Sequence, residues 1–327
     1  MGGRVYVTFG LGASLAGQEL RPVIKVVGVG GAGCNIVGSA DIDFRHAERI
    51  AINTDARSLY GLSCRKILIG KELTRGRGAS SDPAIGEQAV LSDIDAVRSA
   101  LAGTDVLFLV CGLGGGTGTG ASPVIARLAG KMGALVVALA TMPFKAEGAL
   151  RGRIASAGLE RLRETADAVL VVENDRLVTE HPMLGFKEAL CMADHLLLDP
   201  VRSITQVLTR ADLPNLRRVL RVRDIAHICL GEGSLGHGPS SGVKFALGPL
   251  APGTDLHNHN KAVVVLHCPP GSKDDELHRI VQELHTFLHE DAEIMWGPIV
   301  DPSLEKEVRL VAVVGKERAP GPPIPHP

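Results

Sequence analysis

The sequence has almost no net charge, few aromatic residues and no long hydrophobic run. Lys and Arg number 35 against 36 Asp and Glu, so the formal net charge is -1. That balance excludes binding of nucleic acid over a broad basic surface, which needs an excess of positive charge. The longest apolar run, over 132–140, is interrupted by Gly133 and is shorter than the roughly 18 residues that span a bilayer. We therefore predict neither a nucleic-acid partner nor a membrane span.

Closely spaced cysteines are also lacking. The six cysteines contain no C-x-x-C pair, which excludes zinc or redox motifs of that kind and argues against a disulfide framework. His257 and His259, and the histidines of the segment 274–289, have no cysteine or clustered carboxylates beside them, so we expect them to face solvent and predict no metal site. Residues 1–21 imitate a signal peptide only weakly, because glycines break the apolar stretch. We predict a flexible extension and a reducing, cytoplasmic location.

Apolar runs and helical segments alternate over the first half of the chain, and this alternation predicts an α/β fold with a mainly parallel, doubly wound sheet. We expect strands over 23–29, 49–53, 66–69, 105–111, 134–141 and 168–172, and helices from 33 onward and over 84–101, 122–131 and 148–165. A long helix follows over 186–209, where Pro200 predicts a kink or a break. Strands over 225–230, 261–267, 293–299 and 308–314 then surround a helix over 274–289, which indicates a smaller α+β domain.

Glycine is what the sequence has in excess: 39 of 327 residues, against a usual share of about 7%. A first cluster, at 28–35, matches G-x-G-x-x-G between a strand and a helix. By itself it fits a tight turn, a phosphate site, or a dinucleotide site in which Asp55 would contact a ribose. A second cluster, LGGGTGTG at 113–120, also lies between a strand and a helix and offers a nest of N–H donors for a di- or triphosphate. No Gly-Lys-Ser/Thr follows, so this is not a Walker A loop.

With this second cluster the chain resembles the tubulin/FtsZ superfamily, and most closely its FtsZ branch of prokaryotic division GTPases. The motifs are GVGGAGCN at 28–35, NTDARSL at 53–59, GRGASSDPAIG at 76–86, GGGTGTG at 114–120 and PFKAEGALRGR at 143–153. The resemblance covers about Val23 to Val314. It implies a GTP-binding domain (22–185), a central helix (186–210) and a C-terminal α+β domain (211–316). It also implies GTP or GDP as ligand, and leaves open whether Mg²⁺ accompanies the nucleotide. The two ends lie outside the resemblance: we expect a flexible extension (1–21) and, because the last residues are rich in proline without apolar periodicity, a disordered tail (317–327).

The resemblance also assigns roles to individual residues. The phosphates would be held by Gly30, Gly31, Ala32, Gly33, Cys34 and Asn35 and by Gly115, Gly116, Thr117, Gly118, Thr119 and Gly120. Ribose, phosphate and base would be contacted by Asn53, Asp55, Glu147, Arg151 and Asn174, and Ala79 would lie in the loop that senses the γ-phosphate. Glu147 and Arg151 are four residues apart and can project to one face, so a plain surface ion pair remains the alternative for them.

Guanine recognition departs from the family pattern. Leu190 and Asp194 stand where an aromatic residue and a polar residue are expected on the central helix. Leu190 can cover the base without stacking. An ionised Asp194 can accept the two guanine donors that adenine lacks, and the alternative is a solvated helix charge.

The segment after the central helix departs further. In the family an Asn followed by two aspartates enters the neighbouring subunit's nucleotide site. Here Asn215 is retained, but Arg217 and Leu220 replace the acids. Either Arg217 or Arg218 contacts the next subunit's phosphate and hydrolysis is slow, or Asp212 or Asp224 supplies the acid. The remaining possibility is that the arginines form a solvated helix face or a patch for an acidic partner.

The expected partner is a second copy of the chain, stacked head to tail into protofilaments with a cytoskeletal or cell-division role. A regulator that caps or copolymerises with another FtsZ-like protein is the alternative. Because the C-terminal sequence GPPIPHP does not resemble the family's tether-binding peptide, membrane contact would need an unknown tether.

Overall fold

The structure is a computed structural model that describes residues 5–9, 21–39, 44, 46–180, 183, 185–222, 224–234 and 255–317. Apart from residue 317, the expected C-terminal tail lies outside the described residues, as do residues 1–4 and 10–20 of the expected extension. In the part of the chain that is described, no helix is both long enough and apolar enough to cross a membrane.

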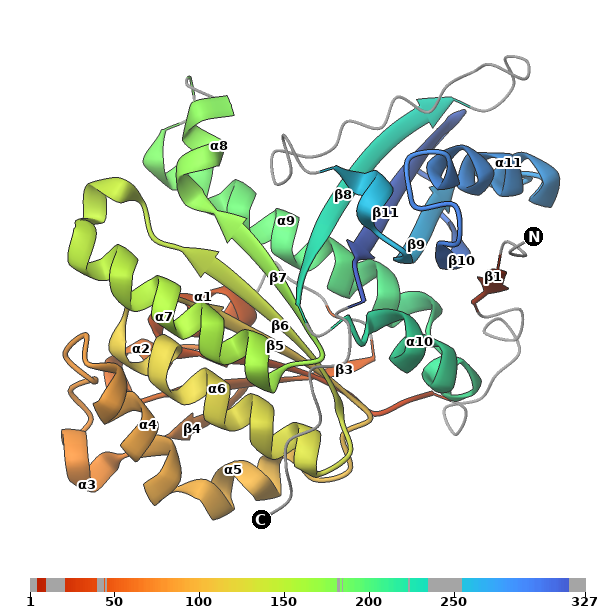
Figure 1. The fold of residues 1–327 in the computed structure, drawn as a ribbon. Helices are drawn as coiled ribbons and strands as arrows, with labels where there is room; N and C mark the ends of the chain where they lie inside the picture. The colour runs from red at the N-terminus through yellow and green to blue at the C-terminus, as the bar shows by residue number, and fades with distance from the viewer. Residues whose placement is uncertain are drawn as a thin grey trace, which may run out of the picture.

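Within these described residues, eleven strands form a continuous sheet in the order β1-β10-β9-β11-β8-β7-β6-β5-β2-β3-β4 (Figure 1). Their bounds are β1 Val5–Thr8, β2 Ile24–Val29, β3 Ala47–Asn53, β4 Arg65–Leu68, β5 Val106–Gly112, β6 Leu135–Met142, β7 Ala168–Glu173, β8 Ile225–Ser234, β9 Lys261–Cys268, β10 Glu293–Val300 and β11 Glu307–Gly315. Strands β2 to β7 pair in parallel, as the sequence predicted. A short parallel pairing of β7 with β8 joins the two halves.

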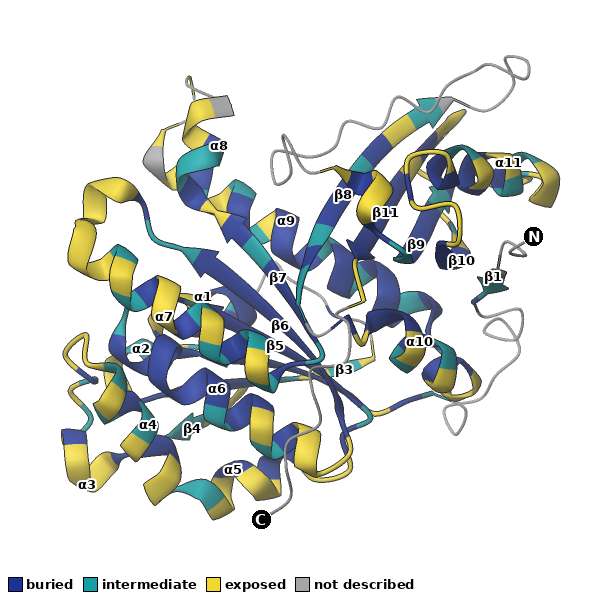
Figure 2. Cartoon of the chain, viewed as in Figure 1, coloured by how far each residue is buried: buried dark blue, intermediate teal, exposed yellow. Residues whose placement is uncertain are grey.

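Helices cover both faces of the parallel half, because its strands are buried on both sides (Figure 2). The helices are α1 Gly30–Gly38, α2 Ala56–Leu59, α3 Lys71–Thr74, α4 Pro83–Ser92, α5 Ile94–Leu101, α6 Gly116–Lys131, α7 Ala149–Thr165, α8 Asn174–Glu180, α9 Phe186–Val207, α10 Leu213–Leu220 and α11 Asp274–His285. One core lies under α4 to α7, and a second lies under α1, α9 and α10.

The long helix α9 is shared between the two halves. Its apolar residues lie in the same core as residues of β5 and β6 and as Val263, Met295 and Val313 of the C-terminal strands. Helix α11 covers the other face of the C-terminal strands through Leu277, Val281 and their neighbours. The α+β arrangement predicted for this half is therefore observed, with the central helix packed between the two halves (Figure 1).

The structure corrects three helix predictions. Helix α6 begins at Gly116 rather than at Ser122, so the second glycine cluster forms its first turns. The helix predicted over 84–101 is two helices that meet at Asp93, whose carboxylate accepts the N–H of Gly70 at 2.6 Å. Pro200 lies inside α9 and does not break it.

The N-terminal extension is partly ordered. Val5–Thr8 pairs in parallel with β10, so the prediction of a flexible segment over 1–21 is wrong for these residues. Tyr6 anchors the strand, since its hydroxyl lies 2.9 Å from Nδ1 of His285. His285 and His259 are buried, against our expectation that these histidines face solvent. A four-residue strand next to an exposed sheet edge leaves no clear pattern in the sequence.

Candidate functional site

A cleft of about 380 Å³ lies at the carboxyl ends of the parallel strands, where ligands bind in open α/β sheets. Its walls come from residues that follow β2, β3, β5, β6 and β7, together with one residue of α9. They are Gly31, Ala32, Asn53, Asp55, Ser58, Gly78, Gly112, Leu113, Gly115, Gly116, Thr117, Gly118, Thr141, Met142, Pro143, Phe144, Glu147, Arg151, Asn174 and Leu190. The two glycine clusters thus meet at one site, as their positions after strands β2 and β5 predicted.

Two helix N-termini converge on this cleft. Helices α1 and α6 both begin there, and neither has a side-chain cap on its first N–H groups. Close approach of the two helices requires glycine, because a Cβ on Gly30 (φ +75°) would lie 2.7 Å from the backbone nitrogen of Gly118. Uncapped N–H groups at the positive ends of two helix dipoles form an anion site, and phosphate is the anion that such sites commonly bind.

Two buried side-chain amides at the cleft each have one atom without a hydrogen-bond partner. Asn53 is 2% exposed and its Nδ2 has no acceptor; Asn174 is 5% exposed and its Oδ1 has no donor. Both residues line the cleft. Since buried polar groups are nearly always paired, a polar ligand that both accepts and donates hydrogen bonds is the natural partner for them. The residues present therefore fit a nucleotide.

A charged pair stands at the rim. Arg151 Nη1 lies 2.9 Å from Glu147 Oε2, and the other carboxylate oxygen of Glu147 accepts the N–H of Phe144 at 2.8 Å. The ion pair that we considered for these two residues is thus formed, and both residues also line the cleft. This arrangement holds the Glu147 carboxylate in a fixed position beside the ligand space.

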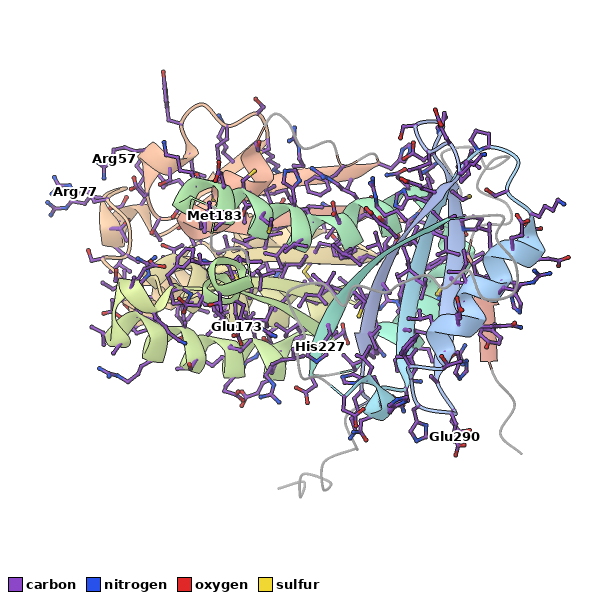
Figure 3. The ribbon with its side chains drawn as sticks, turned by 90° about the horizontal axis from the view of Figure 1, so that it is seen from above. Arg57, Arg77, Glu173, Met183, His227 and Glu290 are labelled. Carbon is purple, nitrogen blue, oxygen red and sulfur yellow. The ribbon has the colours of Figure 1, made fainter. Side chains whose placement is uncertain are left out.

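Asp55 also lines the cleft, two residues after the end of β3. Burial raises its pKa, but hydrogen bonds from the backbone and side chain of Arg57 outweigh this and lower the pKa below its ordinary value. Arg57 and Arg77 extend from this end of the molecule (Figure 3). The hydroxyl of Thr117 lies 2.6 Å from that of Thr54 and so links α6 to the end of β3.

Several residues assigned by resemblance do not line the cleft. Gly33 and Gly120 sit where close packing allows no side chain: a Cβ would overlap the carbonyl oxygen of Val110 or of Pro83, respectively. Thr119 is buried, and its hydroxyl accepts the N–H of Gly114 at 2.9 Å. The other residues of this group are Gly30, Cys34, Asn35, Ala79 and Asp194.

Cys34 shows why the assignment to phosphate fails for its side chain. The fourth residue after Gly30 in α1 turns toward the sheet, where the thiol contacts the carbonyl oxygens of Gly28 and Ile52 at 3.5 and 3.4 Å. Burial raises the pKa of this thiol to about 12. Ala79 is also buried. A Cβ added to Gly116 would lie 2.7 Å from the Cβ of Ala79, so Ala79 packs against the glycine turn.

Asp194 lies on α9, one turn beyond Leu190. Leu190 lines the cleft, whereas Asp194 does not. Burial raises the pKa of Asp194 to about 6. The carboxylate is therefore more than a solvated helix charge, because it is held where its ionised form is poorly stabilised.

Residues 212–224, the segment that lacks the two acids, include α10, which lies at the amino ends of the parallel strands, away from the cleft. Arg217 donates to the carbonyl oxygens of Asp105 and Gly133, at 3.1 and 2.7 Å, just before β5 and β6 begin. Arg218 forms an ion pair with Glu293, and its other terminal nitrogen lies 3.3 Å from Oδ1 of Asn215. Both arginines of α10 thus contact their own subunit, and Arg218 also remains exposed to solvent.

The two candidate acids of this segment, Asp212 and Asp224, also form contacts within their own subunit. Asp212 is buried and its carboxylate accepts the N–H and the hydroxyl of Thr209, at 2.9 and 2.6 Å. Asp224 pairs with Arg163 at 2.6 Å. Leu220 is 2% exposed and belongs to the core under α9. None of these side chains is near the cleft of its own subunit.

Sequence reasoning missed part of the wall. Residues 141–144, at the end of β6 and just after it, and residues 112–113, at the end of β5 and just after it, all line the cleft. These residues carry no charge, and although Leu113, Pro143 and Phe144 begin two of the sequence motifs, none of them was given a role at the site. Their position directly after strands that neighbour the glycine clusters is the signal that would have found them.

The fold and the cleft together define an α/β protein of the nucleotide-binding class, in which two helix N-termini replace a Walker A loop. The family description "Tubulin/FtsZ family, GTPase domain" matches residues 23–180. The chain is 41% identical to cell division protein FtsZ 1 of Archaeoglobus fulgidus over 310 residues, which is 93% of this chain and 84% of that protein. It is 40% identical to cell division protein FtsZ 1 of Halobacterium salinarum over 304 residues, 91% and 77% of the two chains.

Solved structures of FtsZ and of CetZ2 have the same fold as this chain. An empty FtsZ dimer from M. jannaschii superimposes with a TM-score of 0.82 at 33% identity, covering 94% of this chain and 96% of that one. CetZ2 from Haloferax volcanii has the same fold at 24% identity, with a TM-score of 0.72 and coverage of 90% and 93%. The chain belongs to the tubulin/FtsZ family.

Proposed function

We propose that the cleft binds GTP and GDP. The observation that carries this proposal is the meeting of two uncapped helix N-termini with the unpartnered Nδ2 of Asn53 and Oδ1 of Asn174. The N–H groups of Gly31, Ala32 and Gly115–Gly118 would hold the phosphates, and Asn53, Glu147 and Asn174 would contact the ribose or base. Leu190 would cover the base. Asp194 lies one turn further along α9 and outside the cleft wall, so its side chain would have to turn toward the base to accept hydrogen bonds from guanine. A Mg²⁺ ion has no ligand set that we can assign from these residues.

We further propose that subunits stack head to tail in a filament with a role in cell division. The cleft lies at the carboxyl ends of the parallel strands, and α10 lies at their amino ends. Head-to-tail stacking would therefore bring α10 of one subunit to the cleft of the next. The M. jannaschii relative is described as a dimer, and the relatives at about 40% identity are named cell division proteins. These names support the role, and the position of α10 supports the geometry.

Hydrolysis of GTP by such a filament should be slow. An attacking water must be oriented by an acceptor, and an arginine cannot accept a hydrogen bond. Asp212 and Asp224 are both committed to contacts within their own subunit. Arg217 and Arg218 would also have to give up their own contacts before either could reach a neighbouring phosphate. A GTPase that uses one of these acids, and a non-polymerising regulator of another FtsZ-like protein, are the alternatives.

One experiment separates these possibilities: phosphate release and sedimentation are recorded together after GTP is added. Pelleting without phosphate release is expected; rapid release would favour the substituted acid, and tight GTP binding with neither would favour the regulator. Arg217→Asp should restore some phosphate release if an acid is what the segment lacks. Arg98→Ala is the control, because Arg98 forms an exposed pair on α5. Leu220 is left unchanged, since an aspartate at this buried position would disrupt the core.

A further inference from the structure

Thr54 is a buried residue that contacts a cleft wall without lining the cleft itself. It follows the last residue of β3 and is 0% exposed. Its hydroxyl oxygen lies 2.6 Å from that of Thr117, in the first turn of α6. In the described part of the chain, this contact is the one hydrogen bond that either hydroxyl makes. The first turn of α6 is thus tied to Thr54 through a single hydroxyl pair.

The backbone of Thr54 holds a second wall of the cleft. Its carbonyl oxygen accepts the N–H of Gly78 at 3.1 Å and lies 3.2 Å from the hydroxyl oxygen of Thr74. That hydroxyl also accepts the N–H of Gly76 at 3.2 Å. Gly78 lines the cleft. One buried residue therefore contacts α6 through its side chain and the segment 74–78 through its carbonyl group.

The loop over 75–81 is held in a conformation that its residues do not prefer. Arg75, Ser80 and Ser81 have φ values of 54°, 47° and 60°. Residues other than glycine rarely adopt this left-handed region, and they persist there only where the surrounding structure holds them. The contacts with Thr54 at one end, and the packing of Ala79 against the first turn of α6, supply that support.

We propose that Thr54 is a positioning residue of the cleft and couples the first turn of α6 to the loop 75–81. This inference rests on the proposed binding of GTP. A phosphate bound by the N–H groups of α6 would fix the first turn of that helix, and the hydroxyl pair would transmit this order through Thr54 to the N–H of Gly78. Thr54 itself would touch no ligand. The competing route is direct contact between the ligand and Gly78.

The full chain is titrated with GTP, and amide hydrogen exchange is measured by mass spectrometry with and without saturating GTP. In the unmodified chain, GTP should slow exchange both in the first turn of α6 and in the loop 75–81. Thr54→Val keeps the shape of the side chain and removes its hydroxyl. This variant should bind GTP about fivefold more weakly, as expected for one lost hydrogen bond, and its loop should lose the response to GTP while α6 keeps it. Thr54→Ser retains the hydroxyl and should restore both properties.

Two further variants complete the test. Thr117→Val breaks the same hydroxyl pair from the side of α6, so it should also abolish the response of the loop, and adding Thr54→Val should cause no further loss. Thr104→Val is the matched control, because Thr104 is buried, donates to the carbonyl oxygen of Leu101 at 2.7 Å and does not line the cleft. It should leave the affinity and the loop response unchanged.

The outcomes separate this inference from the proposed function. If the unmodified chain does not bind GTP, the proposed function is wrong and this inference falls with it. If GTP binds but the loop does not respond, or responds equally in Thr54→Val, the coupling through Thr54 alone is refuted. The same holds if Thr54→Ser behaves like Thr54→Val.

Discussion

Gly115 and Gly120 look equivalent in the sequence, yet the structure gives them different tasks. Gly115 lines the cleft, and a Cβ added there meets no atom within 4 Å. Gly120 does not line the cleft, and a Cβ added there would overlap the carbonyl oxygen of Pro83 in α4. We therefore expect Gly115→Ala to impair ligand binding and Gly120→Ala to impair folding.

The magnitudes follow from two opposing effects. Alanine is favoured over glycine inside a helix by about 1 kcal/mol. Overpacking costs about 1–3 kcal/mol, and a clash with backbone, which no rotamer change can relieve, belongs at or above the upper end. Gly120→Ala should therefore lower the free energy of unfolding by about 2 kcal/mol. Gly130→Ala is the matched control: it lies in the same helix with open space around it, so it should raise stability by up to about 1 kcal/mol.

The assay is urea unfolding without nucleotide, followed by circular dichroism, with GTP affinity measured separately on folded protein. Gly115→Ala should leave the unfolding midpoint unchanged and weaken GTP binding at least tenfold, or about 1.4 kcal/mol. If Gly120→Ala unfolds at the same urea concentration as the unmodified chain, the packing argument is wrong. If Gly115→Ala binds GTP normally, the glycine cluster does not face the phosphates.

Three further predictions concern charged residues. Glu147→Gln should change the free energy of unfolding by less than about 1 kcal/mol, because its pair with Arg151 is partly exposed, while GTP affinity falls in an equilibrium titration. Because burial raises the pKa of Asp194 to about 6, the folded state binds its proton more tightly than the unfolded state, and stability falls as the pH rises from about 4 to about 6. Asp194→Asn should therefore stabilise the nucleotide-free chain by about 1 kcal/mol at pH 7 but not at pH 4, after discounting for solvent, and should weaken GTP binding; equal stabilisation at both pH values in urea unfolding would contradict this. Arg217→Ala removes two hydrogen bonds from a charged donor and should lower the free energy of unfolding by about 2 kcal/mol, and an unchanged urea midpoint would mean that α10 is held by its apolar face alone.

The sequence by itself was enough for the family and for the parallel half of the sheet. Both conclusions rest on local signals: glycine clusters directly after apolar runs, and a regular alternation of strands and helices. The carboxyl ends of neighbouring parallel strands meet at one edge, so order along the chain already brought residues such as Asn53, Thr117 and Asn174 to one cleft.

Only the tertiary structure decided what each residue does there. Whether a glycine faces ligand or packs against another helix depends on α4, which the glycine motif does not encode. Arg217 donates to carbonyl oxygens 112 and 84 positions away along the chain, and Asp224, just before β8, pairs with Arg163 of α7. Strand β1 pairs with β10 almost the whole chain length away. Such contacts arise from the packing of distant elements, and no local spacing in the sequence records them.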